Sequence, residues 1–235
     1  MKFAHPFLFS SLMAVLVAAS SRPVMVPAAG DPMPDSPSGA IKLPKPVHDG
    51  RTSLEKTLLE RRSVRQYKNA PILLSDLSQL LWAGQGISGP GGRRTAPSAG
   101  ALYPLDIYVV AGNVAGLSAG IYSYDPHKHE LNRIAEGDAR TELSKAALGQ
   151  SSIKSAPTVL VLSAVYERTT VKYGERGIRY VHMEAGHAAQ NIYLQAAALD
   201  LGTVVIGAFD DDGIRQVLHM KGRERPLYLL PVGKK

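Results

Sequence analysis

The segment from Arg61 to Arg65 concentrates groups that can bind a phosphate. Arg61, Arg62 and Arg65 surround Ser63, which places three guanidiniums and one hydroxyl within five residues. Guanidiniums present fixed forks of N–H donors that match the oxygens of a phosphate. Exposed arginines are also common, so composition alone supports a solvated basic turn equally well. The spacing therefore indicates a candidate site for a small anion.

A second candidate segment follows a glycine-rich approach over residues 84–92. It contains Pro97, Ser98, Ala99 and Gly100, whose small size lets the backbone come close to a flat ligand and present amide hydrogens to it. Ser98 has Ala96 where a nucleophile elbow requires a glycine two residues before the serine, which argues against a hydrolase. By itself this pattern is a weak indication of a ligand site.

Residues that bind metals are sparse in this chain. The absence of cysteine excludes disulfides, thiolate nucleophiles and cysteine-bound metal or iron–sulfur centres. Glu184 and His187 form one Glu-x-x-His pair, whereas di-iron bundles use two such pairs with further glutamates. We expect both residues to be satisfied polar groups in the interior or at a subunit contact, and we expect no metal site.

The formal net charge of +7 raises the question of a nucleic-acid partner. The basic residues are scattered apart from short clusters, and no aromatic residues are interleaved with them to stack bases. Small clusters of this kind suit a small anion better. We therefore expect no nucleic-acid partner.

Apolar spacing predicts the helices that position the two candidate segments. Leu54, Leu58 and Leu59 recur at helical intervals, so the arginine segment should follow the end of a helix. Ser75 is expected to cap a second helix that ends at residues 84–86, before the small-residue segment. The apolar face of this second helix comprises Leu77, Leu80 and Leu81.

The rest of the chain predicts a sheet covered by helices. A helix over residues 180–199 carries alanine and glycine around its circumference, so we expect it to pack on several sides. Helices and strands alternate irregularly, which favours an α+β fold with a mixed sheet flanked by helices and one long central helix. Strands are expected at residues 105–111, 121–124, 130–134, 158–165, 203–206 and 227–232, and further helices at 138–149 and 211–218.

The N-terminal region differs from the rest of the chain. Residues 1–20 hold an apolar run of 13 residues, which is typical of a signal peptide and shorter than the roughly 18 to 20 residues that span a bilayer. The alternatives are an uncleaved N-terminal anchor and an apolar leader on a cytoplasmic protein. Residues 21–52 contain seven of the 16 prolines and predict a linker or extended arm, which leaves 53–235 as one domain. We expect a protein that is exported, or anchored to the membrane.

Six ordered motifs resemble those of the nitroreductase superfamily, and the SagB-type dehydrogenases are the most similar branch. Several motifs in the right order are far more specific than any one of them. The resemblance covers roughly residues 53–235. Its motifs lie at residues 61–65, 96–104, 172–177, 184–191, 207–210 and 231–233.

The resemblance implies a homodimer, with the long helix at the subunit interface and two FMN molecules each contacted by both chains. The residues implied to hold the FMN phosphate, ribityl chain and pyrimidine edge are Arg61, Arg62, Ser63 and Arg65, with Lys234 as a further basic residue near the C-terminus. Those implied to reach the same flavin from the second chain are Pro97, Ser98, Ala99 and Gly100. Ile206 and Gly207 would lie beside the isoalloxazine and offer a backbone amide near N5.

The resemblance also implies an activity, in which hydride passes between an organic substrate and N5 of the flavin. Lys172 and Tyr173 match a pair that azoline-oxidising members use near the substrate, where a general base removes a proton. The alternative is that these two residues take no part in the reaction and only shape the substrate pocket. A small molecule or a peptide is the expected substrate, and NAD(P)H is a candidate electron donor for a protein that stays in the cytosol. The alternative function is a non-catalytic flavin-binding protein or partner subunit in a peptide-modifying complex.

Overall fold

The computed structural model describes residues 39–235, which form one seven-stranded sheet with helices on both faces. The strand order is β1-β8-β7-β5-β9-β11-β10, and neighbouring strands are antiparallel. The strands are β1 (Ile41–Lys42), β5 (Leu105–Ala111), β7 (Gly120–Asp125), β8 (Glu130–Glu136), β9 (Thr158–Ala164), β10 (Leu201–Thr203) and β11 (Arg225–Lys234).

Two short strand pairs and two 3-10 turns connect the main elements. The pair of β2 and β6 is parallel, and the pair of β3 and β4 is antiparallel. Their bounds are β2 (Ile72–Leu73), β3 (Ile87–Gly89), β4 (Arg93–Arg94) and β6 (Val114–Ala115), and the turns are η1 (Pro90–Gly92) and η2 (Ala99–Ala101).

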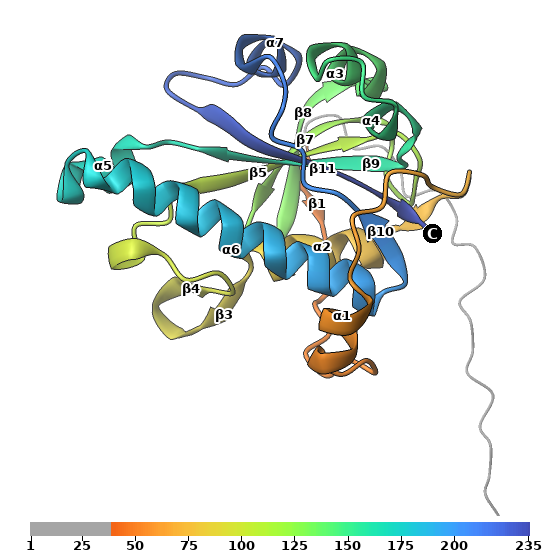
Figure 1. The fold of residues 1–235 in the computed structure, drawn as a ribbon, viewed down its shortest axis with the longest axis horizontal. Helices are drawn as coiled ribbons and strands as arrows, with labels where there is room; N and C mark the ends of the chain where they lie inside the picture. The colour runs from red at the N-terminus through yellow and green to blue at the C-terminus, as the bar shows by residue number, and fades with distance from the viewer. Residues whose placement is uncertain (1–38) are drawn as a thin grey trace, which may run out of the picture. The chain divides into compact units, whose positions relative to one another are not determined.

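The helices divide between the two faces of the sheet. In Figure 1, α6 crosses below the central strands, whereas α3, α4 and α7 lie above them. The helices are α1 (Leu54–Glu60), α2 (Leu74–Gln85), α3 (Arg140–Ala146), α4 (Ser151–Ser155), α5 (Glu167–Tyr173), α6 (Arg176–Ala198) and α7 (Asp211–Val217). The expected α+β architecture is confirmed.

Each face of the sheet builds its own hydrophobic core. Successive side chains of a strand point to opposite faces, so Ile107 and Val109 of β5 join one core while Tyr108 and Val110 join the other. Every residue of β9 is buried, as its continuous apolar sequence predicts for a strand covered on both sides. The sheet is therefore a rigid layer between two sets of helices.

Helix α6 is 23 residues long and only partly covered within one chain. Val181, Ala185 and Ile192 are buried among the core residues that the sheet and α2 also supply. Another stripe of the helix is exposed, and it includes Met183 with 53% of its surface accessible. A Cβ at Gly186 would meet nothing within 4 Å, so this part of the helix leaves room for close packing by another element.

The end of the predicted arm is part of the folded unit. β1 extends the edge of the sheet by pairing with β8. The amide of Val47 donates to the side-chain oxygen of Gln79 at 2.8 Å, and the Gln79 amide group donates back to the carbonyl of Val47 at 2.9 Å. The predicted leader, residues 1–20, and most of the arm lie outside the described residues. Within residues 39–235, no helix combines the length and the apolar character needed to cross a membrane.

Candidate functional site

Tyr193 of α6 holds the arginine segment in place. The end of α1 at Glu60 turns the chain so that Ser63 pairs in parallel with Thr203 at the edge of β10. The Ser63 hydroxyl then lies 3.0 Å from the Tyr193 hydroxyl. The Arg61 guanidinium lies 5.1 Å from the centre of the Tyr193 ring, which is a cation–π distance. Arg61 and Ser63 are thereby brought together on one side of α6.

The other basic residues predicted for this site are oriented differently. Arg62 turns back on α1, where its Nη1 donates to the carbonyl of Leu59 at 2.8 Å. Arg65 is exposed. The backbone carbonyl of Lys234 accepts from the amide of Lys68 at 2.9 Å, which places the strand end near the arginine segment. Burial raises the pKa of Asp76, and the Lys234 ammonium opposes that shift, so the Lys234 side chain lies toward the start of α2.

The segment after β10 passes the same side of α6. The amide of Val205 donates to the Tyr193 hydroxyl at 2.9 Å. The amide of Ile206 donates to the carbonyl of Leu229 at 2.8 Å, so it is not available to a ligand. Gly207 is exposed, and its amide has no hydrogen bond within residues 39–235. Of the two residues predicted to offer an amide to the flavin, Gly207 is the one that can do so.

The small-residue segment contacts the predicted catalytic pair. Gly100 has φ +63°, and a Cβ added to it would lie 2.9 Å from the Tyr173 hydroxyl and 3.1 Å from Nζ of Lys172. Lys172 and Tyr173 end α5, a helix that positions both side chains beside this segment. The Lys172 ammonium lies 5.4 Å from the centre of the Tyr173 ring, and the Tyr173 ring packs edge-on against Tyr180 of α6. Two sets of residues that were predicted separately therefore meet in one chain.

Ser98 anchors the same segment to the interior. Its hydroxyl oxygen accepts a hydrogen bond from the amide of Tyr103 at 2.9 Å. The neighbouring carboxyl of Glu184 is only 3% exposed. Burial raises the pKa of Glu184 to about 7, while the nearby Ser98 hydroxyl and the charge of Arg94 oppose this shift. Glu184 is thus a buried carboxyl directly behind the predicted flavin segment.

The two groups of predicted cofactor residues lie on opposite sides of α6. Ser63 contacts Tyr193, whereas Ser98 lies close enough to Glu184 to affect its pKa. Positions 184 and 193 are nine residues apart, which is about two and a half helical turns, so their side chains leave the helix in opposite directions. Within one chain, the helix separates the arginine segment from the small-residue segment.

The Glu-x-x-His pair does not gather further metal-binding side chains. Glu184 is buried, and His187 is exposed on the next turn of α6. Among residues 39–235, no three His, Asp or Glu side chains lie together as metal ligands would. The described residues therefore offer no metal centre at this pair.

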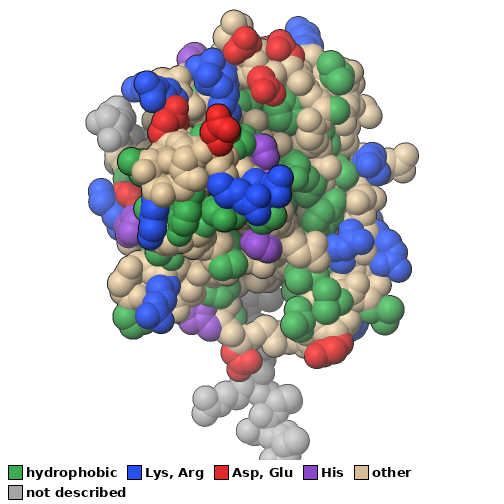
Figure 2. Space-filling view, turned by 60° about the vertical axis from the view of Figure 1, so that its left-hand side comes forward, with side chains coloured by type: hydrophobic (Ala, Val, Ile, Leu, Met, Phe, Trp, Pro, Cys, Tyr) green, Lys and Arg blue, Asp and Glu red, His purple; other side chains and the backbone are tan. Residues whose placement is uncertain are grey.

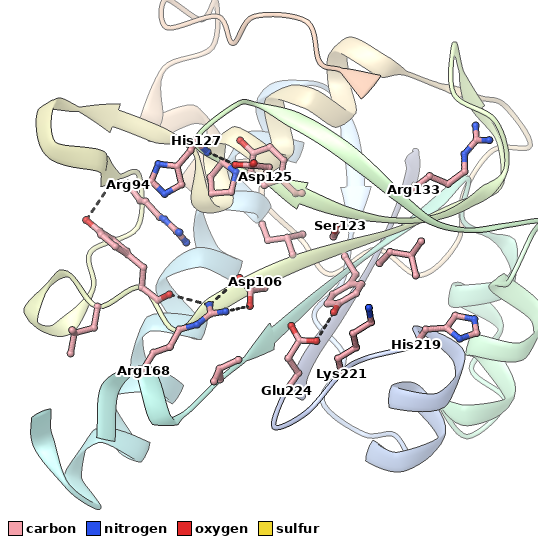
Figure 3. Close-up of a pocket in the computed structure, with 18 of the residues that line it drawn as sticks. Arg94, Asp106, Ser123, Asp125, His127, Arg133, Arg168, His219, Lys221 and Glu224 are labelled. Atoms are coloured by element: carbon pink, nitrogen blue, oxygen red, sulfur yellow. Dashed lines mark hydrogen bonds and ion pairs between the residues drawn. The ribbon is translucent and has the colours of Figure 1, made fainter. Parts of the chain in front are cut away.

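A separate hollow of about 1320 Å³ lies along β5, the β7–β8 turn and the loop after α7. Figure 3 shows Arg168 beside Asp106 and Glu224 beside Lys221 on its wall. An oxygen of Asp106 lies 2.9 Å from Arg168, and the Tyr108 hydroxyl donates to Glu224 at 2.5 Å. None of the residues predicted to bind the cofactor lines this hollow. Two pairs of its polar groups, Asp106 with Arg168 and Tyr108 with Glu224, therefore face each other on its wall.

Charged side chains are dispersed over the surface on the α5 side of the molecule. Figure 2 shows Lys and Arg in several separate groups on this face, with Asp and Glu between them. A nucleic-acid backbone requires a continuous basic stripe or patch. Figure 2 shows no such continuous stripe on this face.

Sequence reasoning missed the role of Tyr193 in this site, because Tyr193 belongs to no spacing that indicates ligand binding. Glu184 was considered only as half of a metal-binding pair, and its position behind Ser98 was not foreseen. A tyrosine within an alanine-rich helix gives no signal of its partners, which lie 130 residues away in the case of Ser63. Only the packing of α6 identifies these roles.

Comparisons with known proteins agree on one family. A model described as the nitroreductase family matches residues 58–234. A Methanocaldococcus jannaschii protein that carries a nitroreductase name is 52% identical over 182 residues, which cover 77% of this chain and 91% of the relative. The crystal structure of a Ralstonia eutropha protein, also named as a nitroreductase, is similar with a TM-score of 0.73 at 31% identity, covering 87% of this chain and 97% of that chain.

A further relative has a name that refers to the processing of a microcin. The microcin B17-processing protein McbC of Escherichia coli is 29% identical over 136 residues. The match covers 56% of this chain and 50% of McbC, so the similarity extends over half of that protein.

Proposed function

This chain belongs to the nitroreductase family, and from that premise we propose that it is an FMN-dependent oxidoreductase that transfers hydride between an organic substrate and N5 of the flavin. The observation that carries the proposal is the position of the motif residues. Arg61 and Ser63 lie beside an exposed Gly207 segment, and Gly100 lies against Lys172 and Tyr173. These groups supply donors for a phosphate, an amide for a flavin and a polar pair for a substrate.

The residues present fit FMN in their chemistry. Arg61 and Arg65 offer guanidiniums for the phosphate, next to the Ser63 hydroxyl. Gly207 offers an amide to the isoalloxazine, where a donor stabilises the electron-rich reduced ring. Gly100 provides a backbone without a Cβ at a positive φ, which permits close approach. The bound flavin would supply the hydride acceptor and donor.

We further propose that each FMN site is completed by two copies of this chain. α6 separates the arginine segment from the small-residue segment within one copy, so a second copy can present its small-residue segment to the arginines of the first. The exposed stripe of α6 around Met183 and Gly186 offers a surface for that pairing. A symmetric dimer would then contain two equivalent sites.

Lys172 and Tyr173 are the proposed proton-handling groups. Both end α5 beside Gly100, so a substrate stacked on the flavin would meet the ammonium and the phenol together. In its deprotonated form, one of these groups would accept the proton that the substrate loses as its hydride passes to N5. The second candidate function is a partner subunit that binds flavin without catalysis, and the likeness to McbC is the observation that favours it.

The substrate class and location follow as parts of the proposal. The likeness to a peptide-processing protein favours a peptide or small organic substrate. The apolar leader at residues 1–20 favours an exported or membrane-anchored protein, which would not meet cytosolic NAD(P)H. In that location the flavin would be reduced by the organic substrate itself. In the cytosol, NAD(P)H would be the donor.

Anaerobic reduction of the FMN-loaded protein tests the proposed activity. Loss of the oxidised flavin spectrum on mixing with NADPH would identify a reductase, and loss only with an organic or peptide substrate would identify a dehydrogenase. Lys172→Met should slow either reduction while FMN remains bound, because Lys172 lies beside Gly100, where the proposal puts the substrate. Tight FMN binding without reduction by any donor would overturn the enzymatic proposal and favour the partner subunit.

A further inference from the structure

Gln150 lies outside the proposed flavin site, yet its side chain reaches the loop of residues 207–210 that borders it. Its Nε2 donates to the carbonyl of Ala208 at 2.9 Å and to the carbonyl of Ala147, at the end of α3, at 3.1 Å. Gln150 stands just before α4, where a short capping side chain is preferred, and its own side chain makes no capping hydrogen bond. Its amide group therefore serves the distant loop and not the helix that it precedes.

The backbone of Gln150 is itself held in place. Its carbonyl accepts from the Ser144 hydroxyl at 2.9 Å, and Ser144 is only 5% exposed. A second hydrogen bond joins the same region to the loop, from the amide of Asp210 to the carbonyl of Ala146 at 2.9 Å. The turn between α3 and α4 is therefore a fixed anchor for the far end of loop 207–210.

The near end of the loop is fixed by β11. Ile206 and Leu229 exchange two backbone hydrogen bonds, of 2.8 and 2.9 Å. In a trans peptide the N–H points opposite to the carbonyl, so the Ile206 carbonyl that faces β11 turns the Gly207 amide away from that strand. The amides of Gly207 and Ala208 have no hydrogen bond within residues 39–235. Two free donors thus lie between two anchors.

The direction of these donors depends on both anchors. Glycine permits a wide range of backbone angles, so the pairing of Ile206 alone leaves the peptide between Gly207 and Ala208 free to rotate. The hydrogen bond from Gln150 to the Ala208 carbonyl removes this freedom. Without it, a ligand that needs the two amides must first order them, which costs conformational entropy on binding.

We propose that Gln150 is a positioning residue of the flavin site, which keeps the amides of loop 207–210 directed at the isoalloxazine. The inference rests on the proposed function. A backbone donor beside the isoalloxazine favours the reduced ring over the oxidised ring, because the reduced ring is richer in electrons. Gln150 therefore increases the affinity for reduced FMN more than the affinity for oxidised FMN.

The affinities for the two forms of FMN test the inference. Fluorescence titration gives the affinity for oxidised FMN, and the midpoint potential of bound FMN, measured anaerobically against a redox dye, then gives the affinity for reduced FMN. Gln150→Met keeps the length of the side chain and removes its donors. It should lower the affinity for reduced FMN about threefold to tenfold more than that for oxidised FMN, the effect of one hydrogen bond. For a two-electron couple, this ratio lowers the midpoint potential by about 15 to 30 mV.

Tyr122→Phe is the control for a loss of stability alone. It removes the hydrogen bond from the Tyr122 hydroxyl to the carbonyl of Ser118, at 2.8 Å, which lies in and beside β7 and not in loop 207–210. Tyr122→Phe should unfold at a lower urea concentration and keep the midpoint potential of the unmodified protein. Gln150→Leu, which also lacks donors, repeats the test should Gln150→Met not fold.

The outcomes separate this inference from the proposed function. An unchanged midpoint potential in the folded Gln150 variant overturns the role of Gln150 and leaves the FMN site intact, even where both affinities fall equally, because an equal fall indicates a structural role only. Absence of FMN binding by the unmodified protein overturns the proposed function and this inference with it.

Discussion

The Tyr193 hydroxyl lies 3.0 Å from that of Ser63 and accepts a hydrogen bond from the amide of Val205 at 2.9 Å. One phenol thus joins three segments that are far apart in the chain: the arginine segment, α6 and the loop before Gly207. The loop and the arginine segment are held in register by this contact. The two ends of the proposed flavin site therefore depend on a residue that need not touch the flavin.

Tyr193→Phe should destabilise the protein and weaken FMN binding together. Removal of the hydroxyl leaves the partly buried amide of Val205 without its acceptor, which costs about 0.5 to 1.5 kcal/mol. Urea unfolding and FMN titration measure the two effects. Tyr180→Phe is the control, because the Tyr180 hydroxyl has no hydrogen bond among residues 39–235. Equal behaviour of the two variants would contradict the role given to Tyr193.

Gly100→Ala should impair the site beyond its backbone strain. The positive φ of +63° costs an alanine about 1 to 2 kcal/mol, and the new Cβ would also press on Tyr173 and Lys172. Gly149→Ala is a matched control, since Gly149 has φ +74° and nothing within 4 Å of an added Cβ. Both variants should lose similar stability in urea, and only Gly100→Ala should lose FMN affinity. Retained affinity in Gly100→Ala would argue against a flavin beside this segment.

Arg61→Gln should weaken FMN binding more than riboflavin binding. Riboflavin lacks the phosphate, so a guanidinium on the phosphate contributes only to FMN affinity, by about 1.5 to 3 kcal/mol. Arg62→Gln is the control, because Arg62 donates to the end of α1 instead. Affinities for both flavins at low and high salt measure the difference. An equal loss for FMN and riboflavin would place the phosphate elsewhere.

His129 should make stability depend on pH through the docked arm. Burial lowers the pKa of His129, and its Nε2 lies 2.8 Å from the Ser78 hydroxyl. The unfolded chain then binds a proton more readily than the folded protein, so stability is full above the unfolded pKa of about 6.5 and falls as the pH drops through it. His129→Asn should flatten this dependence between pH 5.5 and 7.5, since asparagine tolerates the positive φ of 52°. The exposed His127 is the control position, and the free energy of unfolding in urea is measured at each pH. His127→Asn should leave the dependence of this free energy on pH unchanged. A weaker dependence in His127→Asn would refute the assignment to His129.

Local patterns predicted the elements well where periodicity or continuous burial decides the structure. β5 has the predicted bounds, and the hairpin of β7 and β8 and the buried strand β9 are confirmed. The predicted cap Ser75 is wrong, because α2 begins one residue earlier, at Leu74. The residue before it, Leu73, is held in the short parallel pair with β6, and this pairing fixes where the helix starts. α5 was missed, since its sequence has no apolar stripe and only Thr169 is buried.

The candidate site was predicted in its parts and not in its arrangement. The arginine and small-residue segments carry local signals, because their composition is itself unusual. That Ser63 and Ser98 lie on opposite sides of α6 depends on how the helix packs, which no local spacing records. The buried Glu184 was expected to be a satisfied polar group, and instead it retains an oxygen without a partner among the described residues.

Mixed dimers test the shared flavin site most directly. One chain would carry Arg61→Gln with Arg65→Gln, and the other Gly100→Val, so that neither variant alone should bind FMN. Each variant chain carries a different affinity tag, so purification on both tags in turn isolates dimers that contain one chain of each variant. A shared site predicts about one FMN per mixed dimer, because one of the two sites combines the intact arginines of one chain with the intact small-residue segment of the other. Mixed dimers that hold no FMN, while the unmodified protein binds it, would contradict a site built from two chains.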